Sequence, residues 1–587
     1  MVIALRLGGL ALLLGLVTQG LCAAGDICYI LGAVSTLIQD RLYFLQGYYS
    51  FVTLNGQSIE PTSSLYSVKV DDTFPIERSI PSSLVTSTDI GSAVHVTETD
   101  PFNASVPIWS SGDTLYVFGG PSSPTNVLPS YNVTSQTWKD VQVEGGSFNF
   151  GNHSYSQAVS TPESGLSFYS GGLAPYTGPS MIRFDASNPA KLSWTNESLG
   201  QGSYGVEVPN LVDGTIVYVP AGKAGLLVSF GGYNVSEGIN SNSGFPYPSD
   251  FSVINVYDIA SHTWFAQQAS GVTPPTYLCQ FCAGVTSSPD NTAFHITIYG
   301  GWSLLELTSY ETVYILSLPS FTWINATSVS AQSNAEQQVN STIGRDQQSC
   351  QVYNNTQLLV LGGNIRAGHQ SLTNGACNQV FAPLRALDLS TYTWQSVFDP
   401  AIEYEVPDTI YSVIGGSATG GATKTVPDSG WADTKLAAVM KQRPPTPTTS
   451  STSSSSSSST ATSTSGAKAT SAADPSPTGY SNVAKSHTAA TAGGVAGGIV
   501  ALALIALLFW FILRSRKRKS RGNAKAAADW QSDNSKTPFE AEDTHLRELH
   551  GDHRPYEVDA TQVYELPDKS YQGAELPARG DGEKPKS

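Results

Sequence analysis

Charged residues are scarce in this sequence. Asp, Glu, Lys and Arg make up 13% of the 587 residues, and the net charge is −16. A nucleic-acid-binding protein needs a basic face for the phosphate backbone, so a nucleic-acid partner is excluded. Glycine (54 residues), tyrosine (27) and phenylalanine (21) are instead plentiful, which favours short strands and tight turns over long solvated helices. The bulk of the chain is therefore predicted to be all-β.

Common catalytic motifs are also missing. The sequence contains no HExxH, no GxSxG and no P-loop. One CxxC occurs at Cys279 and Cys282, but a zinc site needs four ligands, and neither a second CxxC nor an HxxxH is present. A redox pair would require a thioredoxin-like βαβ pattern, which the sequence lacks. We therefore expect no enzyme activity, no catalytic residue, no bound metal and no cofactor.

Cysteine is rare, with six residues in all, and Cys22 lies in a segment that we expect to be removed. The other five precede residue 444, namely Cys28, Cys279, Cys282, Cys350 and Cys377. In a secreted chain such residues favour disulfides. Cys350 comes just before an apolar run and Cys377 lies in the connection after it, which predicts a bond between these two. Cys279 and Cys282 either bond to each other or supply one partner for Cys28, and one thiol remains by count.

Two apolar runs predict the topology. The first 24 residues carry Arg6, an apolar core and then small residues, as in a signal peptide cleaved near Ala24; an uncleaved signal anchor is the alternative. Residues 493–513 hold no charge and reach about 31 Å as a helix, enough to cross a bilayer. Basic residues follow at 514–521, so the C-terminus is predicted to be cytoplasmic. We expect a single-pass type I protein of the plasma membrane.

The segments around this predicted span are polar. Residues 433–491 are rich in Ser, Thr and Pro and predict a disordered, glycosylated stalk, and residues 522–587 predict a disordered cytoplasmic tail. The polybasic segment from Arg514 to Arg521 is suited to anionic lipid headgroups. Overlapping GxxxG spacings within 493–498 predict a homodimer through the membrane helix, although small residues are common in such helices.

Sequons for N-glycosylation agree with this topology, because all of them precede the stalk. The acceptor asparagines are Asn103, Asn132, Asn152, Asn196, Asn234, Asn325, Asn340 and Asn354.

A repeat dominates residues 25–432. Each copy is an apolar strand ending in a Gly pair, then a second apolar strand and a turn that ends at Trp. In the clear copies these residues are Gly119, Gly120 and Trp138; Gly171, Gly172 and Trp194; Gly231, Gly232 and Trp264; Gly300, Gly301 and Trp323; and Gly362, Gly363 and Trp394. An eroded first copy has Gln46 and Gly47 in place of the pair. The glycines permit a tight bend and the Trp residues supply apolar surface, so we assign them structural roles.

This pattern resembles the kelch repeat, as in fungal cell-surface kelch proteins and the propeller of galactose oxidase. The resemblance implies an all-β kelch-type β-propeller at residues 25–432, with six blades favoured and seven as the alternative. The segment from Glu403 to Trp431 contains a further predicted strand at 411–416. Either it pairs with the N-terminal blade to close a six-bladed ring, or it belongs to an incomplete seventh blade.

The function expected by analogy is non-enzymatic. A propeller on a stalk suits a cell-surface binding or adhesion module for a wall glycan or a protein, with Phe245 and Tyr247 of the long loop 233–250 as candidate ligand contacts. One alternative is a cell-wall or surface sensor that signals through the tail. Another is a copper oxidase similar to galactose oxidase, which needs two His and two Tyr around one metal. The candidate histidines are His95, His153, His262, His295 and His369, and nothing in the sequence brings them together.

Overall fold

The computed structural model describes residues 22–90, 107–118, 126–145, 157–170, 181–197, 211–239, 246–330 and 344–444. Within these ranges, residues 54–55, 63, 162, 304, 368–369, 372–376 and 378–381 are not described. The described chain is mostly β-structure, with helices α3 (Asp408–Ile414) and α4 (Thr434–Val439) near its C-terminal end. No helix in these ranges is long and apolar enough to span a membrane. The predicted signal peptide before residue 22, the predicted stalk beyond residue 444, the membrane span, the basic segment and the tail all lie outside the described residues.

Six units of four antiparallel strands recur along the described chain. The first three comprise β2 (Val34–Ile38), β3 (Arg41–Leu45), β6 (Ser64–Lys69) and β8 (Val85–Asp89); β9 (Ile108–Ser111), β10 (Thr114–Val117), β11 (Val127–Asn132) and β12 (Thr137–Glu144); and β13 (Gln157–Thr161), β14 (Leu166–Ser170), β15 (Met181–Asp185) and β16 (Leu192–Asn196). The last three comprise β18 (Thr215–Val219), β19 (Leu226–Phe230), β22 (Val253–Asp258) and β23 (Thr263–Gln268); β26 (Cys282–Ser287), β27 (Phe294–Tyr299), β30 (Val313–Leu318) and β31 (Thr322–Asn325); and β32 (Ser349–Tyr353), β33 (Gln357–Leu361), β36 (Leu384–Asp388) and β37 (Thr393–Gln395). These small sheets are consistent with kelch blades.

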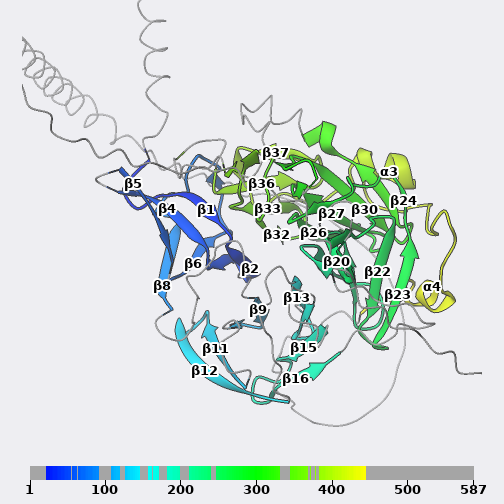
Figure 1. Cartoon of the computed structure of the whole chain (residues 1–587), viewed down its shortest axis with the longest axis horizontal. Helices are drawn as coiled ribbons and strands as arrows, with labels where there is room; N and C mark the ends of the chain where they lie inside the picture. The colour runs from blue at the N-terminus through cyan, green and yellow to red at the C-terminus, as the bar shows by residue number, and fades with distance from the viewer. Residues whose placement is uncertain are drawn as a thin grey trace, which may run out of the picture. The chain divides into compact units, whose positions relative to one another are not determined.

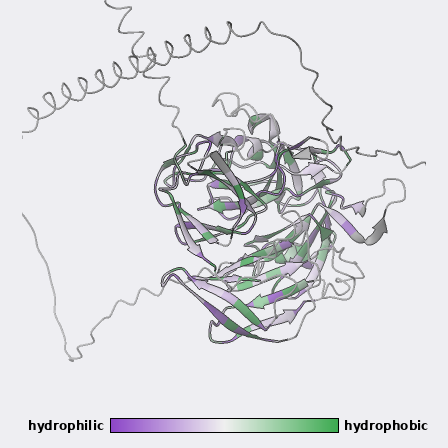
Figure 2. Cartoon of the chain, turned by 60° about the vertical axis from the view of Figure 1, so that its left-hand side comes forward, coloured by the Kyte–Doolittle hydropathy of each residue, from purple (hydrophilic) through white to green (hydrophobic). Residues whose placement is uncertain are grey.

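The first strands of the units are arranged around a common centre (Figure 1). Each first strand contacts those of the two neighbouring units, in the order β2, β9, β13, β18, β26 and β32, and β32 contacts β2. The middle strands are covered on both faces, because every residue of β27, β30, β33 and β36 is buried. This double burial explains why the sequence shows continuous apolar runs here rather than strict alternation. Figure 2 shows hydrophobic residues along the strands of these units.

The repeat residues that the structure describes lie where strands bend and units pack. Both glycines of the pairs at 231–232, 300–301 and 362–363 have positive φ, and Gly119, Gly120, Gly171 and Gly172 lie outside the described residues. Trp194, Trp264, Trp323 and Trp394 are buried, whereas Trp138 is half-buried. The indole N–H of Trp323 donates to the Phe251 carbonyl at 2.8 Å, which joins the fifth unit to the fourth.

Small extra sheets combine two kinds of segment, namely loops that follow the Gly pairs and short stretches that precede first strands. They are β1 (Ile27–Leu31), β4 (Tyr48–Thr53) and β5 (Gly56–Pro61); β17 (Leu211–Val212), β20 (Tyr233–Ile239) and β21 (Pro246–Pro248); and β25 (Leu278–Cys279), β28 (Trp302–Ser303), β29 (Thr308–Ser309), β34 (Arg366–Ala367) and β35 (Gln370–Ser371). We call these the loop sheets. Because first strands begin where second strands end, the loop sheets share one end of the ring.

The C-terminal segment differs from the prediction. Residues 411–416 do not form a strand, because 408–414 is helix α3. Ile410 and Ile414, four residues apart on one helical face, are buried against the last two units. Ring closure instead involves β7 (Phe74–Pro75) pairing with β38 (Val397–Phe398), so the segment from Glu403 onward is neither a closing strand nor a seventh blade in the described structure.

The packed chain continues past the predicted boundary at residue 432. Helix α4 follows, and Leu436 and Met440 are buried against the fourth and fifth units. The Gly222 N–H donates to the Gln442 carbonyl at 3.0 Å. Beside them, β24 (Ser270–Gly271) runs parallel to β31 on the outer side of the fifth unit.

The buried side chain of His295 is expected to make the stability of the folded protein sensitive to acid. It is fully buried on β27, and neither ring nitrogen has a hydrogen-bond partner among the described residues. Burial lowers its pKa from 6.5 to about 3, so the unfolded chain binds a proton there that the folded chain does not. Stability from this site is complete above pH 6.5 and falls as the pH drops toward 3, by about 3 kcal/mol between pH 7 and pH 4.

His295→Leu should remove this part of the pH dependence. Urea unfolding of both proteins at pH 7 and pH 4 gives two differences in unfolding free energy. We expect the difference for the variant to be smaller by about 3 kcal/mol. Equal differences would contradict the assignment of the acid sensitivity to His295.

Candidate functional site

The six first strands surround a cavity on the axis of the ring, which we call the axial cavity. Two overlapping hollows, of about 270 Å³ and 330 Å³, make it up. Each first strand contributes to the shared wall, through Ser35, Ile108, Ala158, Ile216, Ala283 and Cys350. The described lining contains no Asp, Glu, Lys, Arg or His. The cavity therefore presents hydroxyl, amide and apolar groups, with no formal charge.

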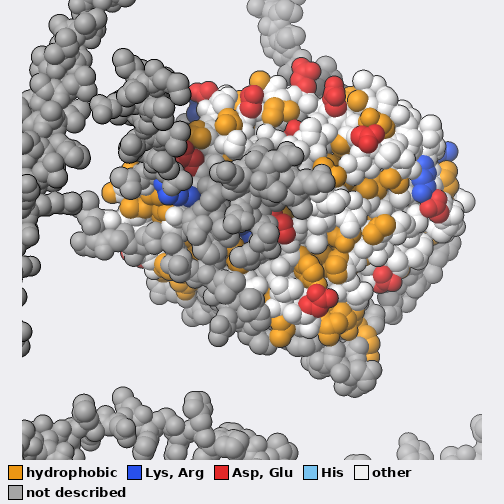
Figure 3. All heavy atoms as spheres, turned by 90° about the horizontal axis from the view of Figure 1, so that it is seen from above, with side chains coloured by type: hydrophobic (Ala, Val, Ile, Leu, Met, Phe, Trp, Pro, Cys, Tyr) orange, Lys and Arg blue, Asp and Glu red, His pale blue; other side chains and the backbone are white. Residues whose placement is uncertain are grey.

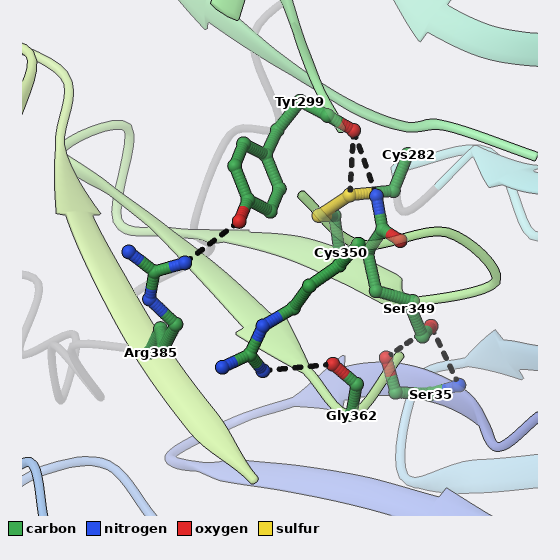
Figure 4. The surroundings of a disulfide bond; sticks show 9 residues. Ser35, Cys282, Tyr299, Ser349, Cys350, Gly362 and Arg385 are labelled. Atoms are coloured by element: carbon green, nitrogen blue, oxygen red, sulfur yellow. Dashed lines mark hydrogen bonds between the residues drawn. A yellow bond between two sulfur atoms is a disulfide. The ribbon is translucent and has the colours of Figure 1, made fainter. Parts of the chain in front are cut away.

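Hydrogen bonds join the sixth unit to the first at the wall of the cavity. The Oγ atoms of Ser35 and Ser349 lie 2.7 Å apart, and the Ser35 N–H donates to the Ser349 Oγ at 3.1 Å. The Gln351 amide donates to the Ser35 carbonyl at 2.9 Å. Figure 4 shows Ser35 and Ser349 facing each other beside a disulfide.

The disulfide pairing predicted from the sequence is wrong. Cys350 bonds to Cys282 and Cys377 bonds to Cys28, so Cys350 and Cys377 are not partners. Cys350 and Cys282 lie on adjacent first strands, β32 and β26, which become neighbours only when blades stack. The CxxC is split between two sheets, because Cys279 belongs to β25 and Cys282 to β26.

Cys279 is the thiol left over. The Tyr233 hydroxyl donates to its Sγ at 3.5 Å, and the thiol donates to the Trp302 carbonyl at 3.3 Å. Burial raises the pKa of the thiol well above its ordinary value. It is therefore a protonated packing residue and not a nucleophile.

Three residues in left-handed conformations stand beside one end of the axial cavity, which we call its mouth, and each is followed directly by a residue that lines the cavity. Asp213, Gln280 and Gln347 have φ values of 59°, 55° and 57°, and each stands two residues before a first strand. The Gln280 N–H donates to the Asp213 carbonyl, and the Gln347 N–H donates to the Gln280 carbonyl, both at 2.9 Å. Because positive φ is uncommon outside glycine, its recurrence at one position in three neighbouring units marks a specific construction.

A buried ion pair lies beside this mouth. The guanidinium of Arg366 donates through Nε to both carboxylate oxygens of Asp346, at 3.0 and 3.1 Å. It also donates to the Gln280 Oε1 at 2.5 Å and lies 4.5 Å from the ring centre of Trp302. The side chain of Asp346 is fully buried, so the pair neutralises a charge that could not stand alone.

Asp213 adds little negative charge to the mouth at neutral pH. Burial raises the pKa of its carboxyl to about 8, although a hydrogen bond from Gln280 and the nearby Arg366 oppose the shift. The carboxyl is therefore mostly protonated at pH 7. Together with the Asp346–Arg366 pair, this leaves the mouth close to neutral.

The predicted ligand contacts are only partly described. Phe245 lies outside the described residues, and Tyr247 is half-buried on β21, where it is paired with Asn234 of β20. Tyr247 thus belongs to a loop sheet and does not line the axial cavity.

The candidate histidines do not meet in the described structure. His95, His153 and His369 lie outside the described residues. His262 is exposed and contacts Glu197 at 2.8 Å, whereas His295 is buried inside the fifth unit. In the part of the chain that the structure describes, no three His, Cys, Asp or Glu side chains are grouped as metal ligands would be.

Five of the eight predicted glycosylation sites lie in the described residues. Asn196, Asn325 and Asn354 are exposed, and Asn132 and Asn234 are half-buried. The remaining acceptors, Asn103, Asn152 and Asn340, lie outside the described residues.

Sequence reasoning missed the residues of the cavity and its mouth. Asp213, Gln280 and Gln347 share a spacing from the first strands, which offers a weak signal once those strands are known. The first strands themselves escaped detection because residues such as Ser349–Tyr353 carry no apolar run and are only half-buried.

The chain was compared with protein family models and with known proteins. No protein family model matches the chain. The chain is similar to a protein of Arthroderma benhamiae named kelch repeat-containing protein, with 27% identity over 401 residues, which cover 56% of this chain and 56% of the relative. The match thus spans little more than half the length of that relative. The relative's name and the small antiparallel sheets together support the kelch resemblance.

Proposed function

We propose that this chain is a non-enzymatic binding module: a six-bladed kelch propeller held outside the cell by the stalk at 433–491 and the membrane helix at 493–513. Its ligand is a glycan or a protein at the cell surface. The signal-like N-terminus, the uncharged run and the basic segment at 514–521 support this placement.

The observation that carries the binding role is the gathering of the loop sheets at one end of the ring. Each one extends the chain beyond the four strands that a blade needs. Two of them lead directly into the mouth, because Asp213 follows β17 and Gln280 follows β25. Loops held on a rigid scaffold are the usual place for recognition residues.

One side of the molecule carries few charged side chains. In Figure 3, which shows one face, acidic side chains are scattered singly among uncharged ones, and basic side chains form no continuous patch. An exposed apolar side chain, Leu305, projects between β28 and β29 with 65% of its surface accessible. Such a residue is suited to contact with a ligand on the loop-sheet end.

The test uses the full-length protein in detergent micelles on a glycan array, together with crosslinking of the full-length protein at the cell surface. Leu305→Ser and Tyr247→Ala change two different loop sheets. We expect each to weaken binding of the ligand found by at least fivefold. Val272→Ser is the matched control. Val272 is 58% exposed and belongs to the fifth unit, as Leu305 does, but it follows β24 at the outer side of that unit.

Two results would overturn the proposal. One is a ligand whose binding responds equally to Val272→Ser and to the loop-sheet variants. The other is a blank array combined with no surface partner whose crosslinking depends on Leu305 or Tyr247.

A further inference from the structure

A side-chain network joins three units beside the mouth, with Gln280 of the fifth unit at its centre. The Arg366 guanidinium donates to the Gln280 Oε1 at 2.5 Å, and the Gln280 Nε2 donates to the Asp213 Oδ2 at 3.3 Å. Arg366 also donates to the carboxylate of Asp346, which accepts a further bond from the Ser309 hydroxyl. The network thus links Asp213 of the fourth unit to Asp346 and Arg366 of the sixth.

The network holds two carboxyl groups but one cation. The guanidinium of Arg366 offsets the carboxylate of Asp346, whose side chain is fully buried, and it reaches Asp213 only through the Gln280 amide. The nearby thiol of Cys279 adds no charge, because burial raises its pKa well above the ordinary value. Ionisation of Asp213 would therefore place a second negative charge beside Asp346 with no cation to offset it, which is costly.

Asp213 also fixes the backbone of the mouth. Its carbonyl accepts the Gln280 N–H, and the Gln280 carbonyl accepts the Gln347 N–H, both at 2.9 Å. The chain around Asp213 is packed against the Gly pair, because a Cβ at Gly232 would lie 2.1 Å from the Val212 carbonyl oxygen and 2.7 Å from the Asp213 carbonyl carbon. Movement of Asp213 therefore disturbs this chain of backbone bonds and the segment packed against it.

Two loop sheets and the cavity wall are connected to this position. Val212, the last residue of β17, pairs with Tyr233 of β20. The Tyr233 hydroxyl lies 3.3 Å from the carbonyl oxygen of Tyr277, next to β25. Gly214, on the other side of Asp213, lines the axial cavity. A change at Asp213 is thus transmitted to the loop sheets that contain β20 and β25 and to the wall of the cavity.

We infer that Asp213 acts as a proton-dependent latch: with its proton bound it joins the fourth unit to the fifth at the mouth, and its ionisation releases this contact. Asp213 is half-buried, so the ionised carboxylate can turn toward water. The latch deepens the proposed function by naming how the loop-sheet end is regulated, and its effect on ligand binding rests on that function.

The pH range follows from the two forms of the latch. In the released form the carboxyl lies in water with its ordinary pKa of 3.8, whereas in the closed form burial raises the pKa to about 8. The released form therefore gains up to about tenfold in population for each pH unit between these values, and gains little above the upper one. This sign is opposite to that of His295, whose effect weakens the protein as the pH falls.

Hydrogen exchange of the full-length protein in detergent micelles, without ligand, tests the latch. Exchange is measured by mass spectrometry at pH 5.5 and pH 7.5, and each rate is divided by the intrinsic rate at that pH. We expect protection of peptides containing the Gln280 and Gln347 N–H groups to fall at least tenfold between the two values. A third measurement at pH 9.5 should show a much smaller further fall, because the closed form is then also ionised.

Asp213→Asn keeps the shape of the side chain and cannot ionise. We expect its protection to change by less than about twofold over the same range, since the released form gains nothing from the rise in pH. Peptide masses confirm that the new amide has not hydrolysed, and the thermal midpoint reports whether the variant folds. Asp140→Asn is the matched control, because Asp140 is exposed on β12 of the second unit, and it should respond to pH as the parent does.

The inference is overturned if protection in the parent is the same at pH 5.5 and pH 7.5, or if it continues to fall at an undiminished rate to pH 9.5. It is also overturned if folded Asp213→Asn protein loses protection as the parent does. The latch fails separately from the proposed function. A surface ligand that depends on Leu305, with exchange at the mouth independent of pH, overturns only the latch, whereas exchange that follows Asp213 without any surface ligand overturns only the surface role.

Discussion

Removal of the disulfide between Cys28 and Cys377 is expected to lower the free energy of unfolding by about 4 kcal/mol. The bond joins β1, ahead of the first unit, to the loop within the last unit, at a sequence separation of 349. It therefore restrains an unfolded chain over nearly the whole ring. It also holds together the two units whose contact closes the ring, since β2 and β32 are otherwise joined by non-covalent contacts such as Ser35 with Ser349.

The double variant Cys28→Ser with Cys377→Ser tests this expectation by urea unfolding under non-reducing conditions. Cys282→Ser with Cys350→Ser is the matched control, because that bond also joins neighbouring units but closes a separation of only 68. The chain-entropy argument predicts a loss smaller by on the order of 1 kcal/mol in the control. A control that loses as much stability as the closure variant, or more, would contradict a special role for ring closure.

Gly232→Ala is expected to lower the free energy of unfolding by about 3–5 kcal/mol, or to prevent folding. Gly232 has a φ of +70°, and a Cβ there would lie 2.1 Å from the Val212 carbonyl oxygen and 2.4 Å from the Gly214 nitrogen. Both neighbours are backbone atoms, so relief requires movement of the segment that carries Asp213. The Gly pair therefore permits the close approach of two chains at the cavity mouth.

Gly421→Ala separates this crowding from backbone strain. Gly421 has a nearly equal φ of +73°, but nothing lies within 4 Å of the position where a Cβ would be. Alanine there should cost about 1 kcal/mol, because only the left-handed conformation is penalised. Expression yield and urea midpoints of the two full-length variants give the comparison. Similar losses in both would show that crowding at Gly232 is unimportant.

The units of the fold are largely visible in the sequence. Runs such as Leu226–Phe230 and Val313–Leu318 are apolar throughout, because blades cover both faces of the middle strands. The Gly pairs and Trp residues then set the repeat length. First strands are less visible, since one face borders the axial cavity and polar residues are accepted there.

The repeat pattern in the sequence did not predict contacts between segments that are far apart in the chain. Residues 408–414 have the composition of a strand, but burial of Ile410 and Ile414 on one face selects a helix. In the same way, the sequence order of Cys350 and Cys377 suggested a local bond, whereas neighbouring first strands bring Cys282 to Cys350. In both places the tertiary packing decided the outcome. It decided whether residues 408–414 form a helix or a strand, and which cysteine bonds to Cys350.

The sequence by itself determined the kelch-like repeat, the positions of the Gly pairs and the abundance of buried aromatic residues, because these depend on local pattern and composition. It also predicts the membrane topology, through hydropathy and charge. Only the tertiary structure decided which cysteines pair, that the ring closes through β32 and β2, and that the six first strands line one cavity whose described wall is uncharged. The physical reason is that these relations join residues of different blades, whose neighbours are set by stacking around an axis and not by distance along the chain.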